Sequence, residues 1–303
     1  YSARLAAQTY SRRETTEAQR AIAREALDNA VRLQPDLPEV QLAQGFYTYY
    51  VEQDYARARQ QFEKVHATWP NEIETFVALG SIARRQGRWE ESRSYYEKAV
   101  ARDPLRADLR SSLVGVLVAT RDLAAAMAAV DEALAHWPTD VGFIAEKARI
   151  LQRLGRLDEA GALLKPLRAR PEGYVYRRIV SQAVLQRQYG EAIGVLEAHL
   201  ARNPDPPTTA NLRLELGRLR GLAGDPIGAV ADLEQARALL ATEYLHRPKN
   251  ASTLNALAWA YCYLGDRVRA ETYVQKAIGL STSAGSRYED TQMRIWAYFG
   301  DRD

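Results

Sequence analysis

The chain has 303 residues, of which 47% are hydrophobic and 26% are charged, and its formal net charge is +3. This composition is that of a folded globular protein, and the small net charge disfavours a nucleic-acid binder, which would carry a strongly basic stripe. No apolar run reaches the roughly 18–20 residues that span a bilayer, so we expect no direct membrane insertion.

Helical patterns begin with the first residues of the chain. Tyr1 already lies inside an expected helix and is not preceded by an initiator methionine, so we expect a piece of a longer protein. Further along, the segment GFYTYYVEQDY (45–55) packs five aromatic residues into eleven positions. Local propensity alone favours a β-strand there, because Tyr and Phe suit pleated, half-buried surfaces. The periodicity of the whole chain predicts a helix instead.

Prolines mark a repeat of about 34 residues. Pro35, Pro70, Pro104, Pro138, Pro171 and Pro204 are separated by 35, 34, 34, 33 and 33 residues. Each repeat also places a small residue four positions before an apolar one, which puts both on the same face of a helix. The eight pairs are Ala23/Leu27, Ala58/Phe62, Ser92/Tyr96, Ala126/Val130, Ala160/Leu164, Ala192/Leu196, Ala229/Leu233 and Ala270/Val274.

The third repeat has the clearest motif, with Phe76, Leu79 and Gly80 before the turn Gly87-Arg88-Trp89, and Ser92, Tyr96, Ala99 and Pro104 after it. On these residues the chain resembles the tetratricopeptide repeat (TPR) superfamily, whose unit is a 34-residue helix–turn–helix. The resemblance covers nearly the whole chain. It implies an all-α, right-handed α-solenoid of about eight repeats plus a C-terminal helix. Glycines at the turns and small residues between the helices fit this expectation.

First helices are expected to begin near residues 4, 38, 73, 107, 141, 173, 210 and 251. Repeat two should hold one additional residue in its turn, because Pro35 and Pro70 lie 35 apart. Pro166 should kink the second helix of repeat five, which predicts a bend at 165–174. We therefore divide one continuous array into 1–172 (repeats one to five) and 173–303 (repeats six to eight with the C-terminal helix). Repeat seven should follow a longer loop and contain about two additional helical turns.

The sequence contains no catalytic or cofactor-binding pattern. The four histidines (His66, His136, His199 and His246) lie late in second helices or just beyond them, and none is paired at metal-ligand spacing. We find no phosphate-binding glycine loop and no nucleophile elbow. The single cysteine, Cys262, is interpreted as a packing residue on a first helix. We expect no enzyme activity, no metal and no cofactor.

In proteins of this superfamily the first helices line a groove that holds peptides or protein segments. The resemblance therefore implies a candidate ligand groove formed by Phe46, Tyr49, Arg84, Arg85, Arg149, Arg153, Arg177, Arg178, Arg218, Asn255, Trp259 and Tyr263. Guanidinium groups bind carboxylates in a two-pronged fashion, so the arginines favour an acidic protein or peptide. The alternative, that these arginines only solvate an arginine-rich surface, is left open. The Lys/Asn pattern by which some members clamp a terminal carboxylate is absent.

Three functions are compatible with these features. The first is a protein-binding scaffold that forms the interaction region of a larger bacterial signalling or regulatory protein. The second is a component of a cell-envelope assembly or export machine, for a pilus or a polysaccharide. The third is an accessory arm of an enzyme. The first predicts a cytoplasmic location, and a periplasmic one is the alternative if an N-terminal anchor or signal precedes this sequence. The pattern is silent on the oligomeric state.

Overall fold

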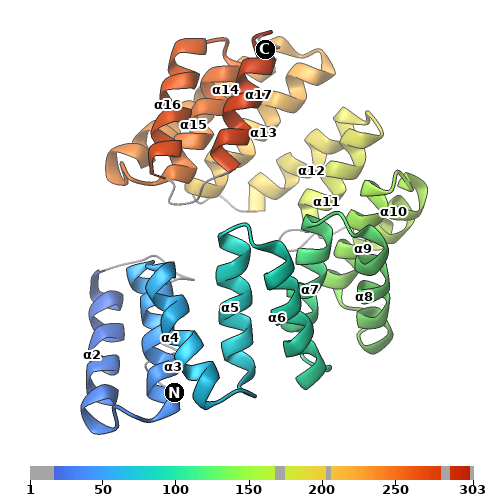
Figure 1. Ribbon diagram of the computed structural model, residues 1–303. Coiled ribbons are helices and arrows are strands. Elements are labelled where there is room, and N and C mark those ends of the chain that lie inside the picture. The colour runs from blue at the N-terminus through green and yellow to red at the C-terminus, as the bar shows by residue number, and fades with distance from the viewer. Residues whose placement is uncertain (1–16, 168–174, 203–205, 281–286, 301–303) are drawn as a thin grey trace. The chain divides into compact units, whose positions relative to one another are not determined.

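The computed structural model describes residues 17–167, 175–202, 206–280 and 287–300 (Figure 1), and every regular element in these ranges is helical. The chain divides into two compact units, an N-terminal unit, Tyr1–Pro138, and a C-terminal unit, Thr139–Asp303. The N-terminal unit contains α2 (Glu17–Leu33), α3 (Pro38–Tyr47), η1 (Thr48–Glu52), α4 (Tyr55–Thr68), α5 (Ile73–Arg85), α6 (Trp89–Arg102), α7 (Ala107–Ala119) and α8 (Leu123–His136). The expected all-α helical-repeat fold is confirmed.

The C-terminal unit continues the same alternation of first and second helices. It contains α9 (Val141–Arg153), α10 (Leu157–Leu164), η2 (Lys165–Leu167), α11 (Val175–Leu185), α12 (Tyr189–Arg202), α13 (Pro206–Ala223), α14 (Pro226–His246), α15 (Ala251–Tyr263), α16 (Arg267–Gly279) and α17 (Arg287–Tyr298). Within each unit, a first helix packs on the second helix that follows it, and that second helix packs on the next first helix. The first helix expected for repeat one lies outside the described residues.

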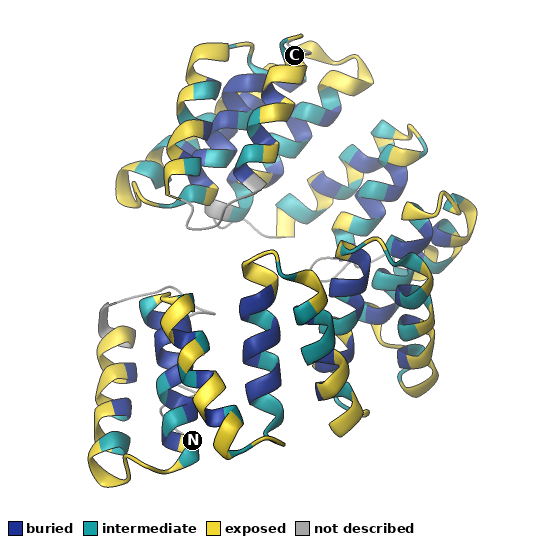
Figure 2. Ribbon diagram, in the orientation of Figure 1, coloured by how far each residue is buried: buried dark blue, intermediate teal, exposed yellow. Residues whose placement is uncertain are grey.

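The core runs between the paired helices, and buried positions face one another inside each pair (Figure 2). The small residues of the repeat permit this close approach. A Cβ added to Gly80 would lie 3.2 Å from the ring of Tyr96, and one added to Gly217 would lie 2.5 Å from Leu233. The turn after most first helices passes through a residue with positive φ, as at Gly87 with φ 72°.

The aromatic segment is helical over residues 45–52, as the repeat predicts, but not α-helical throughout. After α3 the chain forms one π-helix, Thr48–Glu52. Gly45 contacts Phe62, 17 positions later, whereas Gly80 contacts Tyr96, 16 positions later. A π-helix accommodates one additional residue per turn. The residue that we expected in the turn of repeat two is therefore accommodated inside its first helix.

Two other local expectations are refined by the structure. The second helix of repeat five ends at Leu164, before Pro166, and a 3₁₀ turn at 165–167 follows, because proline cannot continue the hydrogen-bond ladder. The remainder of the predicted bend, 168–174, lies outside the described residues. The division expected after residue 172 differs from the observed division after Pro138.

Repeat seven is longer than the others, as predicted, with 18 residues in α13 and 21 in α14. The loop expected before α13 is shorter than the sequence indicated, because the helix begins at Pro206 rather than near 210. Proline is tolerated in the first helical turn, where its missing N–H has no intrahelical partner. The last helix, α17, packs on α15 and α16 as a first helix does.

Candidate functional site

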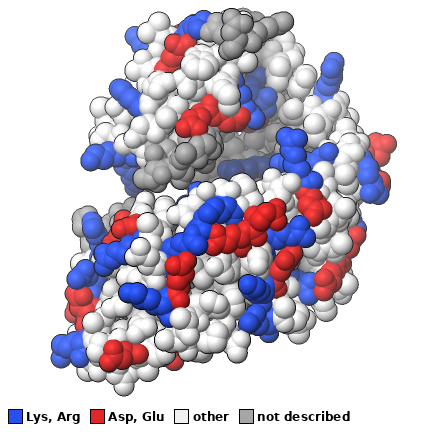
Figure 3. Space-filling view, in the orientation of Figure 1, with Lys and Arg blue, Asp and Glu red and all other residues white. Residues whose placement is uncertain are grey.

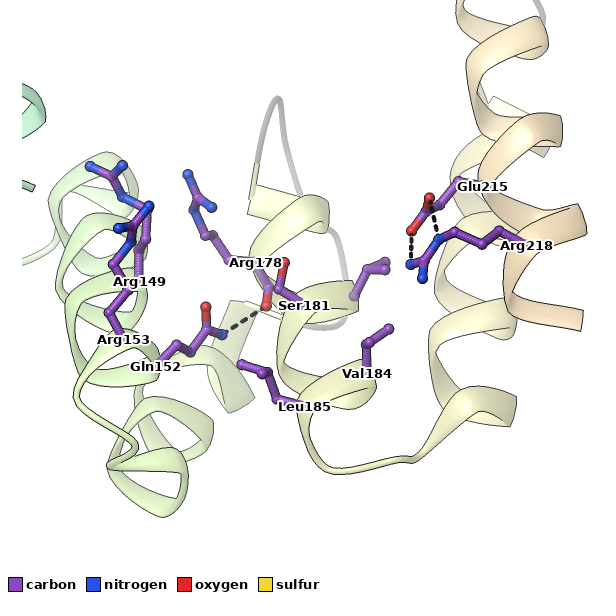
Figure 4. A pocket seen from close by; sticks show the side chains of 10 residues that line it. Arg149, Gln152, Arg153, Arg178, Ser181, Val184, Leu185, Glu215 and Arg218 are labelled. Atoms are coloured by element: carbon purple, nitrogen blue, oxygen red, sulfur yellow. Dashed lines mark hydrogen bonds and ion pairs between the residues drawn. The ribbon is translucent and has the colours of Figure 1, made fainter. Parts of the chain in front are cut away.

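A pocket of about 540 Å³ opens in the C-terminal unit between three successive first helices, α9, α11 and α13 (Figure 4). It brings together four of the arginines that the sequence placed in the groove. Its lining consists of Arg149, Gln152, Arg153, Arg178, Val180, Ser181, Val184, Leu185, Glu215 and Arg218. We call this the basic pocket.

A buried amide network positions the first two helices of the basic pocket. The side-chain amide of Gln152 on α9 donates to the carbonyl oxygen of Arg178 and to Oε1 of Gln182, at 3.1 Å each. Gln182, which is fully buried on α11, donates in turn to the carbonyl oxygen of Leu157 at 2.7 Å. Because a buried amide is costly unless its hydrogen bonds are made, this chain fixes the register of α11 against α9. Sequence reasoning did not single out either glutamine.

Positive groups outnumber negative groups in the basic pocket. Glu146 pairs with Arg149 and also lies 3.7 Å from Arg178. Glu215 accepts two hydrogen bonds from Arg218, at 2.6 and 3.1 Å, and this pairing raises the pKa of the Arg218 guanidinium. The lining therefore holds four arginines and one glutamate, and it retains an excess of positive charge.

Arg149 is a partly buried arginine of the basic pocket. Nε of Arg149 is buried and has no hydrogen-bond partner among the described residues. Next to the arginines, Val184 and the exposed Leu185 provide an apolar strip. The pocket thus combines guanidinium groups with an apolar strip.

Arg177, next to Arg178 on α11, does not line the basic pocket. Its Nε donates to the hydroxyl of Tyr176 at 3.1 Å, and the pair borders a second hollow of about 290 Å³. The ring of Tyr176 stacks on His199 with centroids 4.0 Å apart. Burial, then the charges of Arg202 and Arg177, lower the pKa of His199. His199 is therefore half-buried against Tyr176.

The candidate residues of the N-terminal unit are arranged differently. Phe46 and Tyr49 are only 3% and 6% exposed and belong to the core, so they do not present their rings to a ligand. Arg85 donates to the Tyr49 hydroxyl at 2.7 Å and covers the rings of Tyr49 and Tyr55. The expected aromatic ligand surface in repeat two is thus wrong, because both rings pack into the core of that repeat. Arg84 remains exposed.

On α15, Trp259 and Tyr263 stack with their ring centroids 5.4 Å apart, and the side-chain oxygen of Asn255 is buried without a hydrogen-bond partner among the described residues. Tyr263 also borders a hollow of about 390 Å³ that includes Arg218. Burial raises the pKa of Tyr263 to about 12. These three residues belong to the same unit as the basic pocket, but none of them lines it.

Surface charge elsewhere is mixed in sign. On the face of the N-terminal unit seen in Figure 3, basic and acidic side chains alternate.

Across the described ranges, no cluster of three or more His, Cys, Asp or Glu residues could hold a metal ion. Burial raises the pKa of the Cys262 thiol to about 12, which suits a packing residue. None of the described helices combines the length and apolarity needed to cross a membrane.

Sequence models described as "Tetratricopeptide repeat" match residues 77–141, 117–173 and 250–282. The chain is 24% identical over 286 residues to "Cellulose synthase operon protein C" of Xanthomonas axonopodis pv. citri (strain 306). That alignment covers 89% of this chain but only 18% of the relative's length.

Solved structures with the same fold have low sequence identity to this chain. Yeast Tom70 is 13% identical with a TM-score of 0.68, over 98% of this chain and 63% of that one. A tetratricopeptide repeat protein from Parabacteroides merdae ATCC 43184 is 12% identical with a TM-score of 0.57, over 85% of this chain and 98% of that one. At such identity the likeness concerns the fold alone.

Proposed function

The chain belongs to the tetratricopeptide repeat superfamily, and from this premise we propose that it is a non-enzymatic scaffold whose C-terminal unit binds an acidic segment of a partner protein. The basic pocket carries the proposal. Three successive first helices contribute four guanidinium groups to one concavity. Glu215 in the lining pairs with Arg218, and Glu146 pairs with Arg149, so an excess of positive charge remains.

The chemistry of the pocket favours carboxylates over other ligands. Planar guanidinium forks match the two oxygens of a carboxylate, and their fields add where several share one concavity. Leu185 adds apolar contact, so an acidic segment with interspersed apolar residues fits better than a free acid.

The test is a double charge reversal of Arg149→Glu with Arg153→Glu, titrated calorimetrically with a synthetic peptide of alternating Glu and Leu. We expect affinity to fall by at least about tenfold, equivalent to about 1.4 kcal/mol. The parent's affinity should also weaken as salt rises, because the Debye length shrinks from about 10 Å at 0.1 M to about 3 Å at 1 M. Circular dichroism should show unchanged helicity.

A matched control separates the pocket from net charge. Arg202 and Arg247 are exposed arginines of the same unit that do not line the basic pocket. Reversing both to Glu changes the net charge by the same amount and should leave peptide affinity within about twofold. An equal loss in both double variants would mean that the peptide senses only overall charge, and would overturn the proposal.

A second candidate role is a segment of an envelope machine for polysaccharide export. The similarity to cellulose synthase operon protein C along 89% of this chain favours it over a signalling role. The two proposals are compatible, because a scaffold in such a machine can hold an acidic partner. The test is to delete this segment in the source organism, locate its protein by fractionation, and measure exported polysaccharide. A cytoplasmic protein with undiminished export would exclude this role.

A further inference from the structure

The hollow bordered by Tyr263 shares Arg218 with the basic pocket, and we propose that it receives a large apolar or aromatic side chain of the same partner segment. This inference rests on the proposed function. The hollow, of about 390 Å³, is lined by Gly217, Arg218, Gly221, Leu222, Ala229, Leu233, Tyr263 and Tyr298. We call it the aromatic pocket.

Arg218 joins the two pockets. It lines the basic pocket with Glu215 and the aromatic pocket with Tyr263, so a bound chain that leaves one enters the other at this residue. Its guanidinium is already held by Glu215 at 2.6 and 3.1 Å, which leaves little charge to attract a second carboxylate. Continuity with the basic pocket identifies the occupant as a further part of the same segment.

The walls of the aromatic pocket favour an uncharged occupant. Tyr263 and Tyr298 meet edge to face with ring centroids 5.8 Å apart, and Tyr298 is 54% exposed. Leu222 is 50% exposed at the rim, although leucine is normally buried. Apart from Arg218, no lining residue is charged. Such pockets typically hold the buried aromatic or aliphatic anchor of an interface.

Gly221 leaves the space that the anchor would fill. A Cβ at Gly217 would strike Leu233 at 2.5 Å, so helix packing accounts for that glycine. A Cβ at Gly221 would meet only Ala229, at 4.0 Å, which is ordinary contact. Glycine inside a helix is destabilising by about 1 kcal/mol relative to alanine, and packing does not require it at this position. The missing side chain keeps the aromatic pocket open.

The test compares an acidic peptide carrying a tryptophan at either end with the same peptide carrying serine there, by calorimetry on the full chain. We expect one tryptophan peptide to bind about tenfold more tightly than its serine counterpart. In Gly221→Phe, which fills the aromatic pocket, that advantage should disappear while the affinity of the serine peptide stays unchanged.

Two further variants make the result decisive. Gly194→Phe adds the same side chain at an exposed glycine of α12 with open space around it, and should keep the tryptophan advantage. If Gly221→Phe fails to fold, Leu222→Ser takes its place. This change removes an exposed apolar side chain without altering the helix packing, and it should reduce the tryptophan advantage. Binding of the serine peptide without any tryptophan advantage in the parent overturns this inference alone. Failure of the parent to bind any of the acidic peptides overturns the proposed function as well.

Discussion

Repeats three and seven share one frame but are stabilised by different chemistry. In α5–α6, Gly80 packs on Tyr96, whose hydroxyl shares a hydrogen bond of 2.8 Å with Ser81. In α13–α14, Gly217 packs on Leu233, and the neighbouring Asp232 is only 3% exposed.

The carboxylate of Asp232 lies 2.5 Å from Arg213 and 3.0 Å from Arg220. Repeat three thus relies on an aromatic contact, whereas repeat seven adds a buried carboxylate that is paired with two partly exposed arginines. A buried charge is tolerated only when paired, so repeat seven should respond more sharply to the loss of a single group.

The largest effect should come from Asp232→Ala. Removing the carboxylate leaves Arg213 without its acidic partner, whereas Arg220 keeps Glu197 at 2.6 Å and Asp225 at 3.5 Å, and breaking a buried pair typically costs about 3–5 kcal/mol. We expect about 3 kcal/mol, because both arginines retain some solvent contact. Hydrogen exchange of the α13 and α14 amides measures the loss locally. Glu234→Ala, two positions later and paired with Arg237 at the surface, should cost under about 1 kcal/mol. Equal effects would show that burial of Asp232 is unimportant.

Tyr96→Ala should rank next. Truncating a buried aromatic side chain removes its contacts and leaves a cavity, so we expect a loss of about 3 kcal/mol in the free energy of unfolding of repeat three. Tyr96→Phe removes only the hydrogen bond with Ser81 and should cost about 1 kcal/mol. Urea denaturation of the parent and both variants provides the measurement. If Phe and Ala were equally damaging, the hydroxyl rather than the ring would be the stabilising element.

The comparison of repeats three and seven also separates the buried residues that the sequence could predict from those that it could not. The small-to-apolar spacing located the helix pairs because a four-residue step identifies one helical face, and both Tyr96 and Leu233 are buried as that spacing requires. The burial of Asp232 was not predictable in this way. An acidic residue beside an apolar one resembles an exposed position until α13 is known to supply Arg213 and Arg220.

In the candidate site, too, some residues could be placed from the sequence and others could not. The resemblance located Arg149, Arg153, Arg178 and Arg218 on first helices, because helical register is readable from the repeat. The Gln152–Gln182 network was missed, because the partner of a buried polar group depends on packing between helices. Tyr49 was misplaced because it lies in a π-helix, which has no sequence signature in a single chain, and Phe46 was misplaced because its packing against Phe62 depends on the second helix.

Glycine-to-alanine changes should separate close contacts from open ones. At Gly217 the new Cβ meets Leu233 at 2.5 Å and the backbone oxygen of Ala229 at 3.0 Å, so we expect a loss of about 1–3 kcal/mol from overpacking. At Gly80 the nearest atoms lie at 3.2–3.3 Å and belong to tyrosine side chains, so a smaller loss is expected. Gly115, with nothing within 4 Å, should gain up to about 1 kcal/mol in helix propensity. Thermal melts that fail to follow this order would contradict the contact argument.

The smallest effect concerns a turn that repeats three and seven make with glycine and repeat four does not. Gly87 and Gly224 have φ of 72° and 82°, and Arg121 adopts the same left-handed conformation with φ 62°. A side chain there costs roughly 1–2 kcal/mol, whereas glycine loses roughly 0.5–1 kcal/mol through its greater freedom in the unfolded chain. Arg121→Gly should therefore stabilise repeat four by about 0.5 kcal/mol, and the reverse change, Gly87→Arg, should destabilise repeat three by about the same amount. Hydrogen exchange of α7–α8 and α5–α6 amides can resolve both. If the two variants change stability by equal amounts in opposite directions, the conformation of the turn residue alone sets the effect. If both variants are less stable than the parent, Arg121 makes a contact that glycine cannot replace.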